Sequence, residues 1–106
     1  MVASHYQLLE SVYETCLAYE LTKRNIAFRR QVSVPIVYDG LALDADLRID
    51  ILVGEGLIVE LKAVEKDNPL YMAQLLTCLK LTGHRLGLLI NFNVPLIKDG
   101  IRRVVR

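Results

Sequence analysis

Three consecutive stretches of strand-type sequence, joined by very short turns, constrain the fold of this chain more than any other feature. The first two, residues 29–40 and 41–53, are rich in Val, Ile and Leu and meet at an Asp-Gly dipeptide, which is typical of tight turns. Only Gly-Glu-Gly separates residues 41–53 from residues 57–64, so these two stretches should pair as an antiparallel hairpin. Pro35 indicates an edge strand or a bulge, because proline cannot donate to a sheet ladder.

Helical patterns flank these strands. Residues 5–25 repeat apolar side chains at helical spacing. A second helix should begin near Pro69, which suits a first turn, and end at Gly83. The apolar run at residues 86–92 should lie centrally in the sheet, and residues 101–105 should add a short last strand. The order α-β-β-β-α-β predicts an α/β fold.

Size and composition indicate a single domain over residues 1–106, because the chain is 53% hydrophobic with a mean hydropathy of +0.32. No apolar run approaches the ~20 residues needed to cross a bilayer, and the N-terminus lacks a signal-peptide pattern. We therefore expect no membrane partner and a cytoplasmic location. Cys16 and Cys78 both fall in apolar helical patterns and are expected to be small buried residues in a reducing compartment.

The charge balance gives no overall case for nucleic-acid binding, since 13 Lys and Arg residues face 12 Asp and Glu residues. The charges are unevenly placed, however. Acidic residues dominate between Asp39 and Asp67, and basic residues dominate from Lys80 onward. This distribution fits a metal site beside a phosphate-binding surface, although ordinary solvated charge explains it more simply.

The hairpin at residues 41–64 carries the polar residues of most interest. Glu60 and Lys62 are two residues apart in an apolar strand, so both side chains should point to one face. A hairpin symmetric about Glu55 places Asp50 opposite Glu60 on that face. The other face is then wholly apolar, which favours this register over a slip by one residue. It contains Ile49, Ile51, Val53, Leu57, Val59 and Leu61.

Two carboxylates facing each other across strands repel, so one must be protonated or a cation must lie nearby. Asp50 and Glu60 would suit a divalent metal such as Mg²⁺, which is commonly held by one or two carboxylates and waters. In the competing explanation, no metal binds, and Lys62 and Arg48 form cross-strand salt bridges with these acids. Elementary physical chemistry leaves the metal site and the salt-bridged sheet equally supported.

A family resemblance favours the metal site. Asp50 followed after nine residues by Glu60-Leu61-Lys62 is similar to the D…(D/E)xK signature of the PD-(D/E)XK nuclease superfamily. The segments LLESVYE, VELKAVE, AQLLTCLKLTG and LGLLINFNVPLIKDGIRRVV resemble the small bacterial GxxExxY proteins of that superfamily. The resemblance covers nearly the whole chain. It implies a mixed sheet flanked by helices and a nuclease that uses Mg²⁺ or Mn²⁺ to cleave DNA or RNA.

The resemblance also implies residue roles. Asp50, Glu60, the Leu61 carbonyl and Glu10 would hold the metal, with Glu20 as the rival of Glu10. Lys62 would assist attack by water or neutralise charge in the transition state, and Gln74 would bind a phosphate or a metal-bound water.

The chain also departs from the family pattern. Gln7 stands at the glycine position of the naming motif, and Cys78 stands where a second motif, Q-x-x-x-Y, has tyrosine. One alternative is therefore a degenerate nuclease fold that binds nucleic acid or a protein without cutting. A second alternative is a plain structural or oligomerisation domain. Domains of this size often cut as dimers, so a homodimer is one expected assembly.

Overall fold

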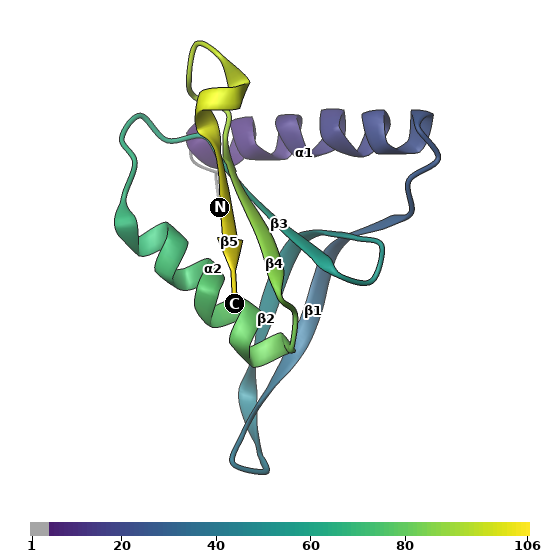
Figure 1. The fold of residues 1–106 in the computed structure, drawn as a ribbon, viewed down its shortest axis with the longest axis vertical. Helices are drawn as coiled ribbons and strands as arrows, with labels where there is room; N and C mark the ends of the chain where they lie inside the picture. The colour runs from purple at the N-terminus through teal and green to yellow at the C-terminus, as the bar shows by residue number, and fades with distance from the viewer. Residues whose placement is uncertain (1–4) are drawn as a thin grey trace.

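The computed structural model describes residues 5–106, with the side chains of residues 5–7 and 45 outside the description, among them Gln7 of the naming motif. Two helices, five strands and a short 3-10 helix follow one another in the order expected from the sequence (Figure 1). Their bounds are α1 His5–Lys23, β1 Phe28–Tyr38, β2 Leu41–Val53, β3 Leu57–Lys62, α2 Pro69–Thr82, β4 Leu86–Asn91, η1 Ile97–Gly100 and β5 Ile101–Val105.

The five strands form one mixed sheet in the spatial order β1-β2-β3-β4-β5. Adjacent strands are antiparallel except β3 and β4, which run parallel because α2 carries the chain back between them. β4 lies between two neighbours, as its apolar sequence predicted. β1 is an edge strand, and its pairing with β2 shifts register after Pro35, so both readings of that proline are confirmed.

The ends of α2 follow from local sequence. Asn68 is the N-cap, and its side chain accepts a hydrogen bond from the Leu70 N–H at 2.9 Å. Pro69 occupies the first turn. Gly83 ends the helix with φ 76°, a left-handed conformation that glycine adopts without steric cost.

The two helices cover opposite faces of the sheet, and the β1–β2 hairpin extends beyond both (Figure 1). On the α2 face, Leu75 and Leu79 pack with Ile58 and Leu89. On the α1 face, Leu17 and Leu21 lie against a second cluster. That cluster contains Ile51, Val59, Leu61 and Ile90. In the described part of the chain, no helix is long and apolar enough to cross a membrane.

The apolar pattern of α1 predicted only part of the face that meets the sheet, which includes Leu17 and Leu21. Glu14 and Ala18 are buried on it, whereas Val12 and Cys16 are exposed. The prediction that Cys16 is buried was therefore wrong, while Cys78 is buried as expected. The apolar pattern of this helix was too broad to define its orientation, because apolar side chains occur nearly all round it.

The hairpin register is confirmed at Val53–Leu57 and Leu52–Ile58. The prediction that Ile49 and Ile51 share one apolar face of the hairpin was wrong at Ile49. Ile49 packs in the α2-side cluster, whereas Ile51 packs in the α1-side cluster. Residues two apart in a regular strand share a face, so the alternation of β2 must reverse between them. The residue at the reversal is Asp50.

Gly100 gives a sharp test of this packing. A Cβ added there would lie well inside van der Waals contact with the backbone carbonyl oxygen of Asn91, whereas one added at Gly56 would meet nothing within 4 Å. We expect Gly100→Ala to destabilise the protein by roughly 1–3 kcal/mol and Gly56→Ala to have little effect. Thermal melts of the two variants check this, and equal melting temperatures would contradict the packing around Gly100.

Candidate active site

Asp50 lies where β2 and β3 stop pairing. The last paired residues on this side are Ile51 and Val59. Beyond them the Asp50 carboxylate accepts a hydrogen bond from the Leu61 N–H at 2.9 Å. A side chain therefore takes the place of a strand carbonyl at the end of the ladder, and Asp50 is held at the junction of the two strands.

Glu60 lies beside Asp50, and its carboxyl group is strongly perturbed. Burial, followed by the nearby Asp50 charge, raises the pKa of Glu60 to about 8, although the Asp50 N–H and the Lys62 ammonium act in the lowering direction. Near neutral pH, the Glu60 side chain therefore holds a proton unless a cation replaces it.

The acids form no direct ion pair with the nearby bases. Across residues 5–106, the salt bridges within 4.0 Å involve other acids, namely Glu14, Glu20 and Asp67. This disfavours the salt-bridged sheet as the reason for placing Asp50 and Glu60 together.

Lys62 is the basic residue whose charge acts on the acidic groups of the site. Its ammonium is 4.8 Å from the centre of the Tyr71 ring, a cation–π contact that limits where the side chain can point. Its charge acts on both Glu60 and Glu10. One lysine therefore serves two carboxyl groups from different elements.

Glu10 brings α1 into the site. Its carboxylate accepts a 3.4 Å hydrogen bond from the Ala63 N–H, just past the end of β3. Burial raises the pKa of Glu10 and the Asp50 charge adds to this, while Lys62 and the Ala63 N–H lower it.

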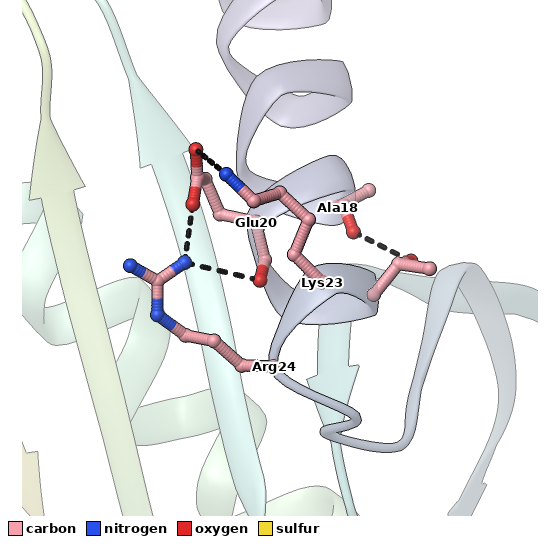
Figure 2. Close-up of polar contacts among 5 residues, drawn as sticks. Ala18, Glu20, Lys23 and Arg24 are labelled. Carbon is pink, nitrogen blue, oxygen red and sulfur yellow. Dashed lines mark hydrogen bonds and ion pairs between the residues drawn. The ribbon is translucent and has the colours of Figure 1, made fainter.

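The rival residue, Glu20, lies elsewhere on α1. Its carboxylate pairs with Lys23 and Arg24 on the helix surface, as Figure 2 shows. The Arg24 hydrogen bond is the main reason that the pKa of Glu20 is lowered. Of the two candidates in α1, Glu10 is the one near the acidic pair.

The Leu61 backbone also faces the junction. Its N–H points toward Asp50, whereas the next carbonyl, that of Lys62, accepts from the Phe92 N–H at 2.8 Å on the opposite side. Successive residues of a strand direct their backbone groups to opposite sides, so the Leu61 carbonyl points to the same side as Asp50. The Leu61 side chain is buried in the α1-side cluster.

Two cavities meet at this junction. The α1-side cavity, about 550 Å³, is lined by Glu10, Ser11, Glu14, Gln31, Arg48, Asp50 and Leu61. The α2-side cavity, about 140 Å³, is lined by Leu47, Arg48, Glu60, Lys62, Tyr71, Gln74, Leu75, Cys78 and Leu89. Asp50 and Glu60 thus line different cavities and meet at their boundary. The expectation that both side chains project from one face of the sheet was therefore wrong.

Gln74 and Cys78 lie one turn apart on α2, beside Glu60 and Lys62. Gln74 is exposed, so its amide is free to reach a bound molecule. Burial, with a smaller contribution from the Glu60 charge, raises the pKa of the Cys78 thiol to about 11. The thiol therefore stays protonated and is a poor nucleophile.

Glu14 is a residue of this region that no sequence motif marked. It is only 7% exposed and forms a 2.9 Å salt bridge with Arg30. Its other carboxylate oxygen accepts a 2.6 Å hydrogen bond from the Gln31 side chain. Glu14 shares helical spacing with Leu17, Ala18 and Leu21, but apolar side chains nearly all round α1 hid this signal in the sequence.

The donors present suit a lightly ligated metal. Among the described residues, no three His, Cys, Asp or Glu side chains are grouped closely enough to enclose an ion. The donor set is instead two carboxyl groups, Asp50 and Glu60, with the Leu61 carbonyl alongside. Mg²⁺ is typically bound by one or two carboxylates with several retained waters, so this set fits it.

The mixed sheet between two helices, with acids gathered where β2 and β3 separate, defines an α/β domain with an acidic site at the sheet junction. A sequence model of the PD-(D/E)XK nuclease superfamily matches residues 4–104. The chain belongs to the PD-(D/E)XK nuclease superfamily. No curated protein sequence matches it.

Solved structures agree on the fold. The crystal structure of an alkaline exonuclease (LHK-Exo) from Laribacter hongkongensis is similar with a TM-score of 0.67 at 16% identity, covering 100% of this chain and 61% of the exonuclease. The same exonuclease in complex with dAMP gives 0.68 at 16% identity, covering 100% and 60%. The structure of SSO0001 gives 0.69 at 18% identity, covering 94% and 52%. The chain thus spans between half and two thirds of the length of these proteins.

Proposed function

We propose that this protein is a metal-dependent nuclease that hydrolyses phosphodiester bonds of nucleic acid. The observation that carries the proposal is the gathering of Glu10, Asp50, Glu60 and Lys62 where β2 and β3 separate. Superfamily membership supplies the reaction class. The finer assignment to the GxxExxY proteins rests on the sequence motifs alone.

In this proposal, Asp50, Glu60 and the Leu61 carbonyl hold Mg²⁺ or Mn²⁺. Glu10 binds the same metal from the edge of the site. The metal would supply Lewis-acid activation of the phosphate and of water. Glu60 must lose its proton when the metal binds. Lys62 stabilises negative charge on the reacting phosphate, because its ammonium is already held beside both carboxyl groups. The Gln74 side-chain amide donates a hydrogen bond to a phosphate oxygen.

A direct assay tests the proposal. The protein is incubated with linear and circular DNA and with RNA, in Mg²⁺ or Mn²⁺ and in parallel with a chelator. Because similar structures include an exonuclease, the linear and circular forms separate cutting at ends from cutting within the strand. Cleavage that the chelator does not abolish, or no cleavage of any substrate, would contradict the proposal.

A binding module without cleavage is the second candidate. Two observations favour it: the net charge of only +1, and a buried, protonated Cys78 at the position of the motif tyrosine. Metal-independent binding of nucleic acid or of a protein partner, without cleavage, would support this candidate.

The single-domain organisation, a homodimer and a cytoplasmic location are further proposals, and sedimentation of the pure protein tests the homodimer.

Glu10 and Glu20 form a matched pair on one helix. Glu10→Gln should weaken Mn²⁺ binding about tenfold, because it removes a charge beside Asp50 and Lys62. Glu20→Gln should leave Mn²⁺ binding unchanged, because its carboxylate pairs only with Lys23 and Arg24 at the surface. Isothermal titration with Mn²⁺ measures both, and equal effects would remove Glu10 from the site.

A further inference from the structure

Gln31 has an unusual backbone for a residue within a strand. Its φ is 50°, in the left-handed region that residues with a side chain rarely adopt. Within residues 5–106, the other non-glycine residues with positive φ are Asn25 and Asp39, which are of types that tolerate this region and lie outside the strands. Gln31 is not a residue type that tolerates this region, and it lies within a strand. Contacts with surrounding residues must therefore stabilise its positive φ.

Gln31 is the residue opposite Asp50. Pairing between β1 and β2 runs from Arg30–Ile51 to Val32–Ile49 without a change of register, and the pair between them is missing. The two strands thus keep their alignment while this single pair is broken. Asp50 is thereby released from β1 at the same point where it leaves the regular ladder with β3.

Both strands change face at this point. Phe28 packs in the α1-side cluster, whereas Val32 packs in the α2-side cluster. In β2, Ile51 and Ile49 make the same change. A residue that reverses the alternation of its strand points differently from its neighbours, which explains how Asp50 lines the α1-side cavity and still contacts Glu60.

Glu14 holds Gln31 in place. Its carboxylate accepts the Gln31 side-chain amide at 2.6 Å and the Arg30 guanidinium at 2.9 Å, so it fixes two successive residues of β1 at the reversal. Glu14 is buried on α1 and lines the α1-side cavity with Gln31 and Asp50. A buried carboxylate with charged and neutral donors is a rigid anchor.

We propose that Glu14 and Gln31 are positioning residues that set the Asp50 carboxylate at the junction of β2 and β3. Glu14 stabilises the left-handed turn of Gln31, and that turn frees Asp50 to accept from the Leu61 N–H. The placement of Asp50 is independent of what the site does. Its consequence for metal binding rests on the proposed function.

The test follows the Leu61 amide by NMR, because its hydrogen bond reports directly on Asp50. Glu14→Leu should shift this resonance toward its position in Asp50→Ala and speed its hydrogen exchange about tenfold or more. Glu14→Gln, which keeps an acceptor for Gln31, should resemble the wild type. Adding Gln31→Gly to Glu14→Leu should restore the resonance, because glycine adopts positive φ without an anchor.

Rescue by glycine distinguishes positioning from general destabilisation, which a second substitution would not repair. A Leu61 resonance unchanged in Glu14→Leu, or still displaced in the double variant, overturns the proposal. If Glu14→Leu does not fold, Gln31→Val takes its place, since a β-branched residue strongly disfavours positive φ. In that case the resonance must be displaced in Gln31→Val and retained in Gln31→Gly, and any other result overturns the proposal.

A second readout connects positioning to the site. Mn²⁺ should bind Glu14→Leu about 10- to 100-fold more weakly than wild type, with recovery in the double variant. If the wild type binds no Mn²⁺, the proposed function fails, while the Leu61 amide still decides whether Glu14 and Gln31 position Asp50.

Discussion

Asp50→Asn should abolish metal binding and nuclease activity without destabilising the metal-free protein. The substitution nearly keeps the shape of the side chain, and its amide oxygen can still accept from the Leu61 N–H. It removes the charge that acts unfavourably on Glu60. The metal-free protein should therefore be as stable as wild type or slightly more so, since functional sites often reduce stability.

The metal response carries the larger effect. A ligand at 100 times its dissociation constant stabilises the folded state by about 2.7 kcal/mol, and Mg²⁺ or Mn²⁺ should raise the melting temperature of the wild type accordingly. Asp50→Asn should lose this shift and should reduce cleavage by more than about 100-fold. Thermal melts with and without metal, together with the cleavage assay, measure both.

Asp46→Asn is the matched control. Asp46 lies on the same strand, is exposed, and accepts a hydrogen bond from the Ser33 hydroxyl at 2.9 Å away from the junction. It should keep the wild-type metal response. If Asp50 were instead a salt-bridge partner, Asp50→Asn would destabilise the protein by ~0.2–1 kcal/mol, the value of an exposed pair. Metal would then change the melting temperature of neither wild type nor Asp50→Asn. That combination would exclude a metal site at Asp50.

Much of this arrangement could be predicted because its signals are local. The Gly-Glu-Gly turn fixed the β2–β3 register, and Pro69 and Gly83 marked the ends of α2. These features depend on steric preferences of a few adjacent residues, which the sequence displays directly. The same register brings Asp50 and Glu60 to adjacent positions just beyond the last pair, Ile51–Val59, but it did not show that they line different cavities.

The reversal at Gln31 could not be predicted, because a left-handed glutamine within a strand has no sequence signature. It depends on Glu14, which is 17 positions away in the sequence. The residue pattern of β1 therefore contains no sign of it. The orientation of α1 was missed for a related reason. Its apolar residues surround the helix, so only contact with the sheet decides that Glu14 is buried and Cys16 is exposed.

Wild-type stability without metal should fall as the pH rises toward 8, and Glu60→Gln should remove this fall. Glu60 has a folded-state pKa of about 8 against an ordinary value of 4.5, because it is buried beside Asp50. Between these values the folded protein keeps a proton that the unfolded chain releases. The unfolding free energy therefore decreases with pH in this window, by at most about 1.4 kcal/mol per unit, and levels off above pH 8.

Glu60→Gln cannot ionise, so it should be more stable than wild type near pH 8, with the difference shrinking as the pH falls toward 5. Glu55→Gln, in the exposed turn of the same hairpin, should retain the wild-type slope. Urea unfolding at several pH values with a chelator present measures the three slopes. A wild type that gains stability between pH 5.5 and 8, or a Glu60→Gln variant that follows it in parallel, would contradict a buried, protonated Glu60.

Metal should reverse the wild-type trend, because binding requires Glu60 to lose its proton. Below pH 8, Mn²⁺ affinity should rise about tenfold per pH unit, since each unit makes the ionised form about ten times more populated. Above pH 8 the affinity should become constant. Titrations at pH 6, 7, 8 and 9 distinguish this from a site at Asp50 alone, whose affinity would already be constant across that range. The same side chain thus lowers the stability of the empty site and sets the pH at which the site takes up metal.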